Sequence, residues 1–296
     1  MTILLLGANG QLGQELRRAL APLSRIVATT RNGTLPDGSA CEVADFDQPA
    51  SLASLLDHVQ PTLVVNAAAY TAVDRAEEDR DAAFRANAEA PGVLARWCAQ
   101  AGVPVVHYST DYVFDGQGTR PYREDDTTAP LGVYGASKLA GEEAIRAAGG
   151  RHLIFRTAWV YASHSANFLR TMLRVGADRD VLRVVADQVG TPTPAALIAN
   201  VTAQALQHGG RLSGTWHLTA KGETSWHRFA EAIFAEAVAA GVLPRAPTVE
   251  AITTAEYPTP AKRPAYSHLD VAKLERDFGV ALPSWQNGLK RVMADC

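Results

Sequence analysis

Short apolar runs alternate with longer amphipathic stretches from residue 2 to about residue 156. The apolar runs are rich in Leu, Ile and Val and short enough for buried strands; they span residues 2–6, 25–30, 62–66, 104–109 and 152–156. The stretches between them have the apolar spacing of helices and span residues 11–20, 49–59, 82–101 and 133–148. This alternation predicts an α/β fold with a doubly wound parallel sheet and right-handed crossovers.

The strand–helix rhythm changes after Arg156. A segment marked by Gly and Pro at 188–194 precedes expected helices at 195–207 and 225–240, with a short strand at 215–218 between them. A proline-rich segment, YPTPAKRP, leads into a last helical region. We therefore expect one domain over residues 1–156. Residues 157–296 would form mainly a smaller C-terminal substrate-binding lobe, with some segments returning to the sheet.

The composition is that of an ordinary globular protein, with 47% hydrophobic and 20% charged residues. A net charge of −3 and a pI near 6.2 give no overall attraction to nucleic acid or to an anionic membrane. No apolar run approaches the roughly 20 residues of a membrane helix. Cys41, Cys98 and Cys296 lie far apart and match no metal or disulfide pattern. We expect a cytoplasmic protein with reduced thiols that binds neither nucleic acid nor a membrane.

Three glycines follow the first expected strand and open a helix: Gly7, Gly10 and Gly13, in GANGQLG. Glycines at such a junction allow a tight turn and let the backbone approach a pyrophosphate, whose charge the helix N-terminus stabilises. The spacing differs from the G-x-G-x-x-G of many dehydrogenases, and a glycine-rich strand end can be a plain turn. Its place at the first strand–helix junction nevertheless predicts a Rossmann domain that binds a dinucleotide.

The residues that follow the second strand bear on the choice of cofactor. Thr30 and Arg31 offer no carboxylate for a ribose 2′-hydroxyl and one guanidinium for a 2′-phosphate, which favours NADPH. A solvated Arg31 with NADH accepted stays open as the alternative. Asp45 and Phe46 could contact the adenine, although loop carboxylates are often only solvated. The small residues 67–69 after the third strand would let backbone lie close to the cofactor.

A second group of residues suggests proton transfer. Tyr134 and Lys138 are four residues apart, on one face of an expected helix, where an ammonium would lower the tyrosine pKa. Thr110 leaves the fourth strand at the same edge of the sheet as the glycine turn. Each feature has a plain structural reading, as a surface pair or a turn hydroxyl. Together with the glycine turn they predict a Thr-Tyr-Lys catalytic set.

These motifs resemble the extended short-chain dehydrogenase/reductase family, and especially its branch that acts on 4-keto deoxysugar nucleotides. The segments NAAAYTAVD, HYSTDYVFDG, RTAWVY, TSWHRFA and YPTPAKRP extend the resemblance along nearly the whole chain. It implies NAD(P)H-dependent reduction of the 4-keto group of dTDP-6-deoxy-L-lyxo-4-hexulose to dTDP-L-rhamnose. In that reaction Tyr134 would donate the proton, Thr110 would orient the transfer, and Lys138 would hold the phenol and the nicotinamide ribose.

The resemblance also assigns binding residues. Those that would line the cofactor are Gly10, Gln11, Leu12, Thr30, Asp45, Phe46, Ala69, Tyr70, Thr71 and Tyr108. The sugar nucleotide would meet Asp111 and Trp159, although a Trp at a strand end is otherwise core. Arg263 could clamp the substrate pyrophosphate, or could be a solvated arginine. The family resemblance further implies Mg²⁺ at a homodimer interface, for which Glu15 is the candidate residue, with no carboxylate cluster around it in the sequence.

Related chemistry on the same fold gives the competing hypotheses. A dehydratase needs an acid/base pair after the threonine, whereas here Tyr112 follows Asp111. An epimerase would favour an acidic ribose ligand where this chain has Thr30 and Arg31. A non-catalytic NADP-binding regulatory subunit is the alternative of a different class, and the intact Thr110 and its partners argue against it. The NADPH or NADH preference, the magnesium requirement and the oligomeric state stay open.

Overall fold

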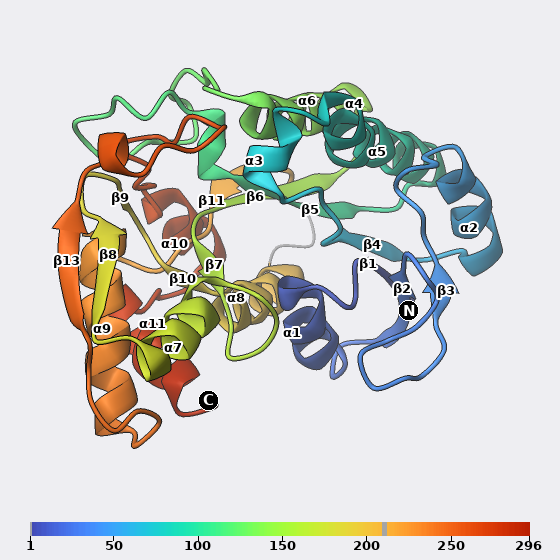
Figure 1. The fold of residues 1–296 in the computed structure, drawn as a ribbon. Helices are drawn as coiled ribbons and strands as arrows, with labels where there is room; N and C mark the ends of the chain where they lie inside the picture. The colour runs from blue at the N-terminus through green and yellow to red at the C-terminus, as the bar shows by residue number, and fades with distance from the viewer. Residues whose placement is uncertain (1, 209–211) are drawn as a thin grey trace.

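A computed structural model describes residues 2–208 and 212–296 and contains a seven-stranded sheet in the order β11-β6-β5-β4-β1-β2-β3 (Figure 1). Every neighbouring pair in this sheet is parallel. Its strands are β1 (Thr2–Leu6), β2 (Arg25–Thr30), β3 (Glu42–Val43), β4 (Leu63–Asn66), β5 (Val105–Thr110), β6 (His152–Thr157) and β11 (Gly214–His217). The predicted fold class, a doubly wound α/β sheet, is confirmed.

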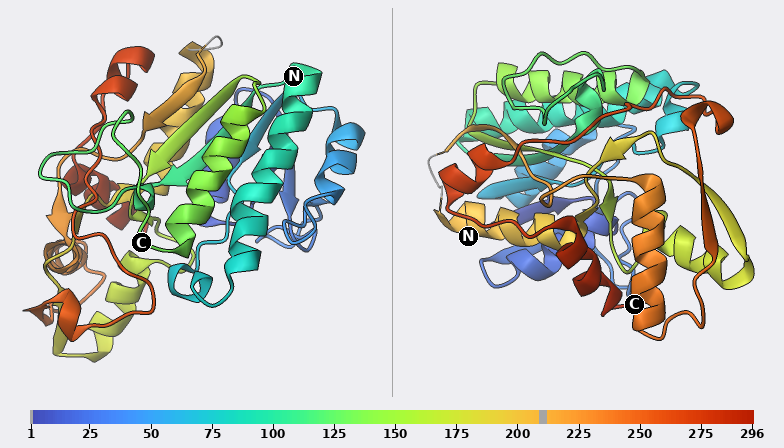
Figure 2. Two further views of the ribbon diagram at one scale, coloured as in Figure 1. Left: turned by 90° about the horizontal axis from the view of Figure 1, so that it is seen from above. Right: turned by 90° about the vertical axis from the view of Figure 1, so that its left-hand side faces the viewer.

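Helices cover both faces of the sheet, as Figures 1 and 2 show. Along β1, Ile3 and Leu5 enter one core and Leu4 and Leu6 enter the other, because successive strand residues point to opposite faces. This is why the strand reads as a continuous apolar run. One core is closed by α1 (Gln11–Leu20), α8 (Ala195–His208) and α10 (Ala272–Phe278), and the other by α2 (Ser51–Val59), α5 (Ala90–Ala101) and α6 (Val133–Ala147).

The helix expected at residues 82–101 is interrupted. It consists of α4 (Arg80–Phe84), the π-helical η1 (Arg85–Glu89) and α5. Pro91 lies in the first turn of α5 and has no N–H, so it cannot continue the α-helical bonding to the Asn87 carbonyl. Gly141 of α6 packs against that carbonyl, where any Cβ would overlap it. The side chain of Asn87, which lies in this interrupted segment, hydrogen-bonds both the backbone N–H and the carbonyl of Tyr70, and also the Ser137 hydroxyl.

The strand order reverses between β1 and β4. The chain runs from β1 outward to β2 and β3, then returns to β4 on the other side of β1 and continues through β5 and β6. The loops after β1 and β4 therefore leave the sheet in opposite directions, and the crevice at their carboxyl ends is where ligands bind in open α/β sheets. The glycine turn and residues 67–69 both lie at this point.

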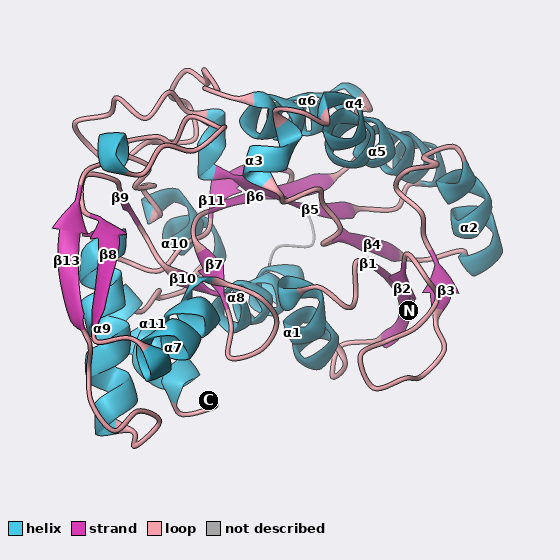
Figure 3. Cartoon of the chain, in the orientation of Figure 1, coloured by secondary structure: helices cyan, strands magenta, loops and turns pink. Residues whose placement is uncertain are grey.

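The chain after residue 157 contributes to two units. β11, α8 and α10 join the main sheet and its core, with β11 paired to β6. The other segments form a separate core, in which β8 and β13 lie well apart from the main sheet (Figure 3). The helices of this core are α7 (Phe168–Asp178), α9 (Trp226–Ala239) and α11 (Trp285–Met293). Its short strand pairs are β8 (Val181–Val185) with β13 (Thr248–Ile252), β9 (Val189–Gly190) with β12 (Thr224–Ser225), and β7 (Val160–Tyr161) with β10 (Thr193–Pro194).

Three short helices complete the described fold: α3 (Val73–Ala76), η2 (Asp111–Val113) and η3 (Thr254–Glu256). Within residues 2–208 and 212–296, no helix combines the length and apolar character needed to cross a membrane.

Candidate active site and cofactor crevice

The turn between β1 and α1 depends on the absence of side chains at two positions. Gly7 has φ +77°, and a Cβ there would lie 2.7 Å from the Ala68 nitrogen. At Gly13, inside α1, a Cβ would overlap the Gly7 carbonyl oxygen. Gly10 differs, because its Cβ would meet only that oxygen at 3.4 Å. Gly10 is also the N-cap of α1 and has no side chain to occupy the free N–H groups, which remain available to an anion.

A cavity of about 500 Å³ opens beside this turn at the switch point of the sheet. Its lining is mostly backbone and small side chains, as expected where a dinucleotide lies against the protein. The lining residues are Gly7, Asn9, Gly10, Thr30, Arg31, Asn32, Ala44, Phe46, Ala67, Ala68, Ala69, Tyr70 and Ala86. The structure thus brings together seven of the cofactor residues expected from the sequence.

The residues that follow β2 and β3 at the edge of this cavity have local structural roles. The Thr30 hydroxyl is buried and holds the turn after β2 through Asn32 and Thr34. The Arg31 side chain is 70% exposed, with its guanidinium 3.6 Å from Asp47, so it lies at the cavity rim and can reorient. The Asp45 carboxylate bonds the backbone of the next turn, and the Phe46 ring lines the cavity from the core beneath it.

Gln11, Leu12, Thr71 and Tyr108 are among the expected cofactor residues that lie outside this lining. Gln11 accepts a hydrogen bond from Asn167 at 2.9 Å, and Leu12 packs against the core. Thr71 is exposed after β4. Tyr108 directs its phenol away from the site, 2.9 Å from the Thr202 hydroxyl, and meets the site only through its carbonyl.

The catalytic candidates meet where α6 crosses the end of β5. Two glycines let α6 approach, since a Cβ at Gly135 would overlap the Tyr112 carbonyl oxygen, and Gly141 lies against η1 as described above. Lys138 is buried, and its ammonium donates to the Tyr108 carbonyl at 2.6 Å. Tyr134 packs edge-on against Tyr112, with ring centroids 5.6 Å apart. The glycines in YGASKLAG are therefore required by the close packing that places the pair.

The electrostatics of Tyr134 differ from the sequence argument, which expected Lys138 to lower the phenol pKa. Burial is the largest influence and raises the pKa of Tyr134, and the charge of Asp111 raises it further, while a hydrogen bond with Thr110 lowers it. Lys138 directs its charge to the Tyr108 carbonyl instead. Tyr134 is therefore a protonated phenol at neutral pH, which is the form that can donate a proton.

Asp111 completes the polar end of the site. It is buried, and its Oδ1 accepts a hydrogen bond from the Thr110 hydroxyl at 2.9 Å. Burial raises the pKa of Asp111 to about 6, and hydrogen bonds from Ser267 and Thr110 oppose that shift. Because Thr110 donates to Asp111, a lone pair of the Thr110 oxygen is available to the Tyr134 phenol or to a substrate hydroxyl.

A second cavity, of about 510 Å³, lies next to this end of the site. It combines aromatic rings with two arginines, and its lining residues are Asp74, Tyr112, Phe168, Thr171, Met172, Arg183, Val184, Val185, Gln188, Trp226, Tyr257, Thr259 and Arg263. Arg263 is held there by Asp74 at 2.6 Å and lies 3.4 Å from the Tyr112 hydroxyl. Asp74 was missed by sequence reasoning, although it ends the NAAAYTAVD segment that marked the site.

Trp159 has an unusual backbone, with φ +46°, in the left-handed region that a bulky side chain rarely adopts. Its indole stacks on that of Trp226, with centroids 3.5 Å apart and planes 5° from parallel. Gly190 lies directly behind the ring and has no room for a Cβ. Trp226 lines the second cavity and Trp159 does not, so Trp226 is a further aromatic residue that sequence reasoning did not find.

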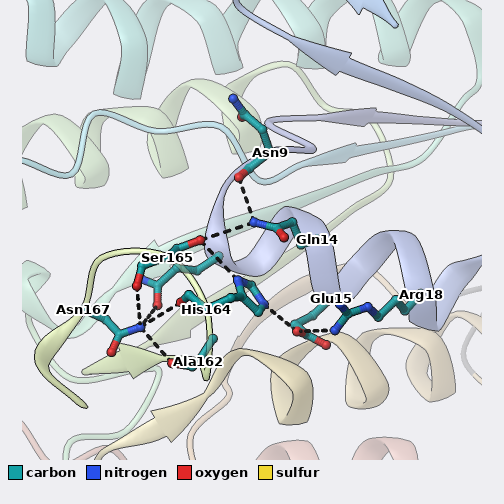
Figure 4. A network of polar contacts seen from close by, with 9 residues as sticks. Asn9, Gln14, Glu15, Arg18, Ala162, His164, Ser165 and Asn167 are labelled. Atoms are coloured by element: carbon teal, nitrogen blue, oxygen red, sulfur yellow. Dashed lines mark hydrogen bonds and ion pairs between the residues drawn. The ribbon is translucent and has the colours of Figure 1, made fainter. Parts of the chain in front are cut away.

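Glu15, the residue expected to bind Mg²⁺, lies in a polar network between α1 and the loop after β7. Its carboxylate lies 2.7 Å from His164 Nε2 and 3.0 Å from the Arg18 guanidinium, and Figure 4 shows this polar network extending to Asn167. Both partners contact the same carboxylate oxygen, Oε1, so two basic groups already engage this carboxylate. In the part of the chain that the structure describes, no group of three or more His, Cys, Asp or Glu residues could hold a metal. The assignment of Glu15 to Mg²⁺ is not supported.

Comparisons with known proteins agree with this geometry. The family model described as "RmlD substrate binding domain" matches residues 1–296. A dTDP-4-dehydrorhamnose reductase of Escherichia coli K12 is 44% identical over 99% of this chain and 97% of its own length, and one of Burkholderia thailandensis is 48% identical over 97% and 96%. Among solved structures, the Clostridium acetobutylicum enzyme of that name has a TM-score of 0.89 at 37% identity, covering 99% of this chain and 98% of its own. The Bacillus anthracis enzyme, solved in complex with NADP, has a TM-score of 0.89 at 34% identity, covering 100% and 99%. This chain therefore belongs to the dTDP-4-dehydrorhamnose reductase family, within the extended short-chain dehydrogenases/reductases.

Proposed function

We propose that this protein reduces the 4-keto group of dTDP-6-deoxy-L-lyxo-4-hexulose with NAD(P)H to give dTDP-L-rhamnose, the last step of dTDP-rhamnose synthesis. The observation that carries the proposal is the assembly of Thr110, Tyr134 and Lys138 at the end of β5, at the same carboxyl edge of the sheet as the glycine turn after β1, in a family whose full-length relatives bear the reductase name. The open crevice beside Gly10 fits a dinucleotide, whose nicotinamide, when bound, supplies the hydride.

The protein's own part in the reaction is to hold the substrate and to deliver one proton. Tyr134 stays protonated in the free site, so it can donate to the alkoxide that forms at the reduced carbon. Thr110 offers its oxygen to the same phenol and orients it. Lys138, one turn along α6 from Tyr134 and fixed by the Tyr108 carbonyl, adds a cationic group to the site.

For the cofactor we propose a preference for NADPH. Arg31 lies at the rim of the crevice and can turn from Asp47 to a 2′-phosphate, and β2 ends without the carboxylate that would bind a 2′-hydroxyl. We further propose that Gln11, Leu12, Asp45 and Thr71 complete the cofactor contacts when the nucleotide is bound.

For the sugar nucleotide we propose that Asp111 and the Trp159–Trp226 stack border the deoxysugar, and that Arg263 holds the pyrophosphate in the second cavity. Guanidinium groups bind phosphate oxygens through paired hydrogen bonds, and Arg263 is already oriented by Asp74. We expect the enzyme to work in the cytoplasm as a homodimer, which rests on the family resemblance alone. Light scattering of the purified protein would test the homodimer.

The test is to mix the protein with the 4-keto sugar nucleotide and NADPH and to follow oxidation of the cofactor, beside a Tyr134→Phe variant. Loss of the proton donor should reduce kcat by roughly 10²–10⁴-fold while NADPH still binds. Tyr161→Phe is the matched control, since the Tyr161 hydroxyl is buried without a partner and lies on neither cavity, so its rate should stay near wild type.

The alternative reading, a non-catalytic NADP-binding subunit, makes a different prediction. In that case wild type and Tyr134→Phe would be equally inactive although both bind NADPH. Turnover with another keto sugar nucleotide in preference to this one would instead point to a different reductase of the same family.

A further inference from the structure

A buried chain of polar side chains lies directly behind Lys138. The Asn66 amide nitrogen, at the end of β4, is 3.1 Å from His107 Nδ1 on β5, and His107 Nε2 is 3.4 Å from the Lys138 nitrogen on α6. Asn66 and His107 are 1% exposed and Lys138 is 2% exposed. Neither Asn66 nor His107 belongs to the catalytic set derived above.

The hydrogen bonds fix which nitrogen of His107 carries a proton. Asn66 Oδ1 accepts from the Ala68 backbone N–H at 3.1 Å, so the amide must present its NH₂ group to His107. His107 Nδ1 therefore accepts, and a neutral imidazole with an accepting Nδ1 carries its proton on Nε2. That N–H points at the Lys138 nitrogen. An ammonium at that position is a donor facing a donor, whereas a neutral amine can accept the bond.

We propose that His107, oriented by Asn66, is a positioning residue that shifts Lys138 toward its neutral form and so lets this lysine give up a proton during turnover. The catalytic meaning of this proposal rests on the function proposed above, whereas the protonation of Lys138 does not.

The burial and charges around Lys138 also favour its neutral form. Burial lowers the pKa of Lys138 to about 8, and the negative charge of Glu142, one turn along α6, opposes that shift. Glu142 is held in a two-bond ion pair by Arg156 of β6 and also contacts Arg146, which weakens its pull on Lys138. On the β5 side, the Tyr108 carbonyl accepts from Lys138. Burial, and then the charge of Lys138, lower the pKa of His107 well below its usual range, so it stays neutral.

The remaining titratable groups near the pair belong to the catalytic set. Tyr134 lies one turn before Lys138 on α6, and Asp111 acts on Tyr134 from the end of β5. Neither contacts His107 in the described structure. Two neutral contacts of Lys138 remain in the described structure: the Tyr108 carbonyl, which accepts from either form and favours the ammonium, and the Asn66–His107 pair, whose Nε2–H favours the neutral amine.

The proton balance of the reaction shows at which step a neutral Lys138 would form. As the alkoxide forms, the Tyr134 O–H bond breaks and an O–H bond forms on the product, which leaves a tyrosinate. A proton given up by the Lys138 ammonium and carried by water, since no contact joins the two groups in the described structure, restores the phenol and leaves a neutral amine. That amine accepts a hydrogen bond from His107 Nε2–H until water returns the proton. No electron is moved in these steps, and the hydride is the established contribution of the cofactor.

The first test needs no variant and no substrate. Long-range ¹H–¹⁵N spectra of the wild-type protein report which ring nitrogen of His107 is protonated. We expect Nε2–H across the range of pH in which the protein is folded. A proton on Nδ1 would overturn the proposal, whatever the enzyme is found to reduce.

The second test measures the titration of Lys138 directly, in protein with ¹³C-labelled lysine, assigned with a Lys138→Arg variant. Asn66→Asp places an acceptor against His107 Nδ1, so the ring must protonate Nδ1 and turn an accepting Nε2 toward Lys138. His107→Phe removes the opposing N–H. Both changes should raise the pKa of Lys138 by about one unit, which is a tenfold change in its protonation equilibrium. The limb of the kcat pH profile that reports Lys138 should move to higher pH as well.

The double variant Asn66→Asp, His107→Phe separates an effect that acts through the His107 hydrogen bonds from an effect of the negative charge added at position 66. If Asn66→Asp acts through the ring, most of its effect should disappear in a His107→Phe background. A full effect in that background, or an unchanged midpoint in both single variants, would overturn the proposal. The tautomer and the lysine titration are measured without turnover. Their outcome is therefore independent of the reductase assay, and either proposal can be overturned while the other holds.

Discussion

The two cavities beside the catalytic set have nearly equal volumes, about 500 and 510 Å³, but they are built in different ways. Seven of the thirteen residues that line the crevice at the switch point are glycine or alanine, and the lining comes from residues 7–86. The second cavity is lined by rings and guanidinium groups that come from residues 74–263. The first is shaped by how closely backbone segments approach, and the second by which side chains pair across the fold. Adding a methyl group should therefore cause a large loss of stability and binding in the first cavity. Removing one member of an ion pair should cause a smaller loss of binding in the second.

The largest effect expected from this difference is that of Gly13→Ala. The new methyl group would overlap the Gly7 carbonyl oxygen, which is backbone and cannot rotate away. We expect a loss of about 1–3 kcal/mol in the free energy of unfolding, a fall of roughly 3–10 °C in Tm, and loss of NADPH binding. Thermal denaturation and a cofactor titration would measure these changes.

Gly10→Ala is the matched control, three residues away in the same turn. Its methyl group would make only a 3.4 Å contact, and its φ of −71° suits alanine. The free protein should therefore keep its Tm, while NADPH binding weakens because the methyl group stands over the N-terminus of α1. A Gly13→Ala protein as stable as Gly10→Ala would show that the crevice is not set by backbone contact.

The second cavity should respond more gently, and Asp74→Asn tests this. The change removes the charge that holds Arg263 at 2.6 Å but keeps the shape of the side chain. The pair is partly exposed, so we expect KM for the sugar nucleotide to rise roughly three- to tenfold, with kcat and the NADPH KM nearly unchanged. Steady-state kinetics with each substrate varied in turn would measure this.

Asp79→Asn is a control from the same region. Asp79 pairs with Arg75 at 3.9 Å on the surface and lines neither cavity. It should leave both KM values unchanged. A fall in kcat with Asp74→Asn, rather than a rise in KM, would mean that Asp74 acts on the catalytic set through Tyr112 and not on substrate binding.

The contrast between the cavities also explains what the sequence could predict. The glycine turn and the Tyr134–Lys138 pair are local patterns, so their spacing and their place after a strand or on a helix could be read from short stretches of sequence, and the buried strands followed from their apolar runs. The ion pair of Asp74 with Arg263 joins residues 189 positions apart, and the Glu15–His164 contact spans 149 positions. Pairings of that kind depend on how the second core packs against the sheet, and one sequence gives no periodic signal for them.

The same distinction accounts for one expectation that is not supported and one that is wrong. Magnesium was assigned to Glu15 by resemblance, but the local sequence could not show that His164 would reach its carboxylate. A lowered pKa was expected for Tyr134 from its spacing to Lys138. Spacing gives the shared helix face but not the burial around it, nor the Tyr108 carbonyl that binds the ammonium.

The smallest effect should come from Arg31, the charged residue at the rim of the first cavity. Its side chain is 70% exposed and shares its charge with Asp47, so solvent and that carboxylate both weaken its pull on a phosphate. Arg31→Ala should reduce kcat/KM for NADPH roughly two- to fivefold and leave the NADH value unchanged. Arg25→Ala, at the opposite end of β2, should change neither. If Arg31→Ala instead lowered both values equally, Arg31 would contribute to the crevice through packing, and the preference for NADPH would have to come from uncharged groups such as Thr30 and Asn32.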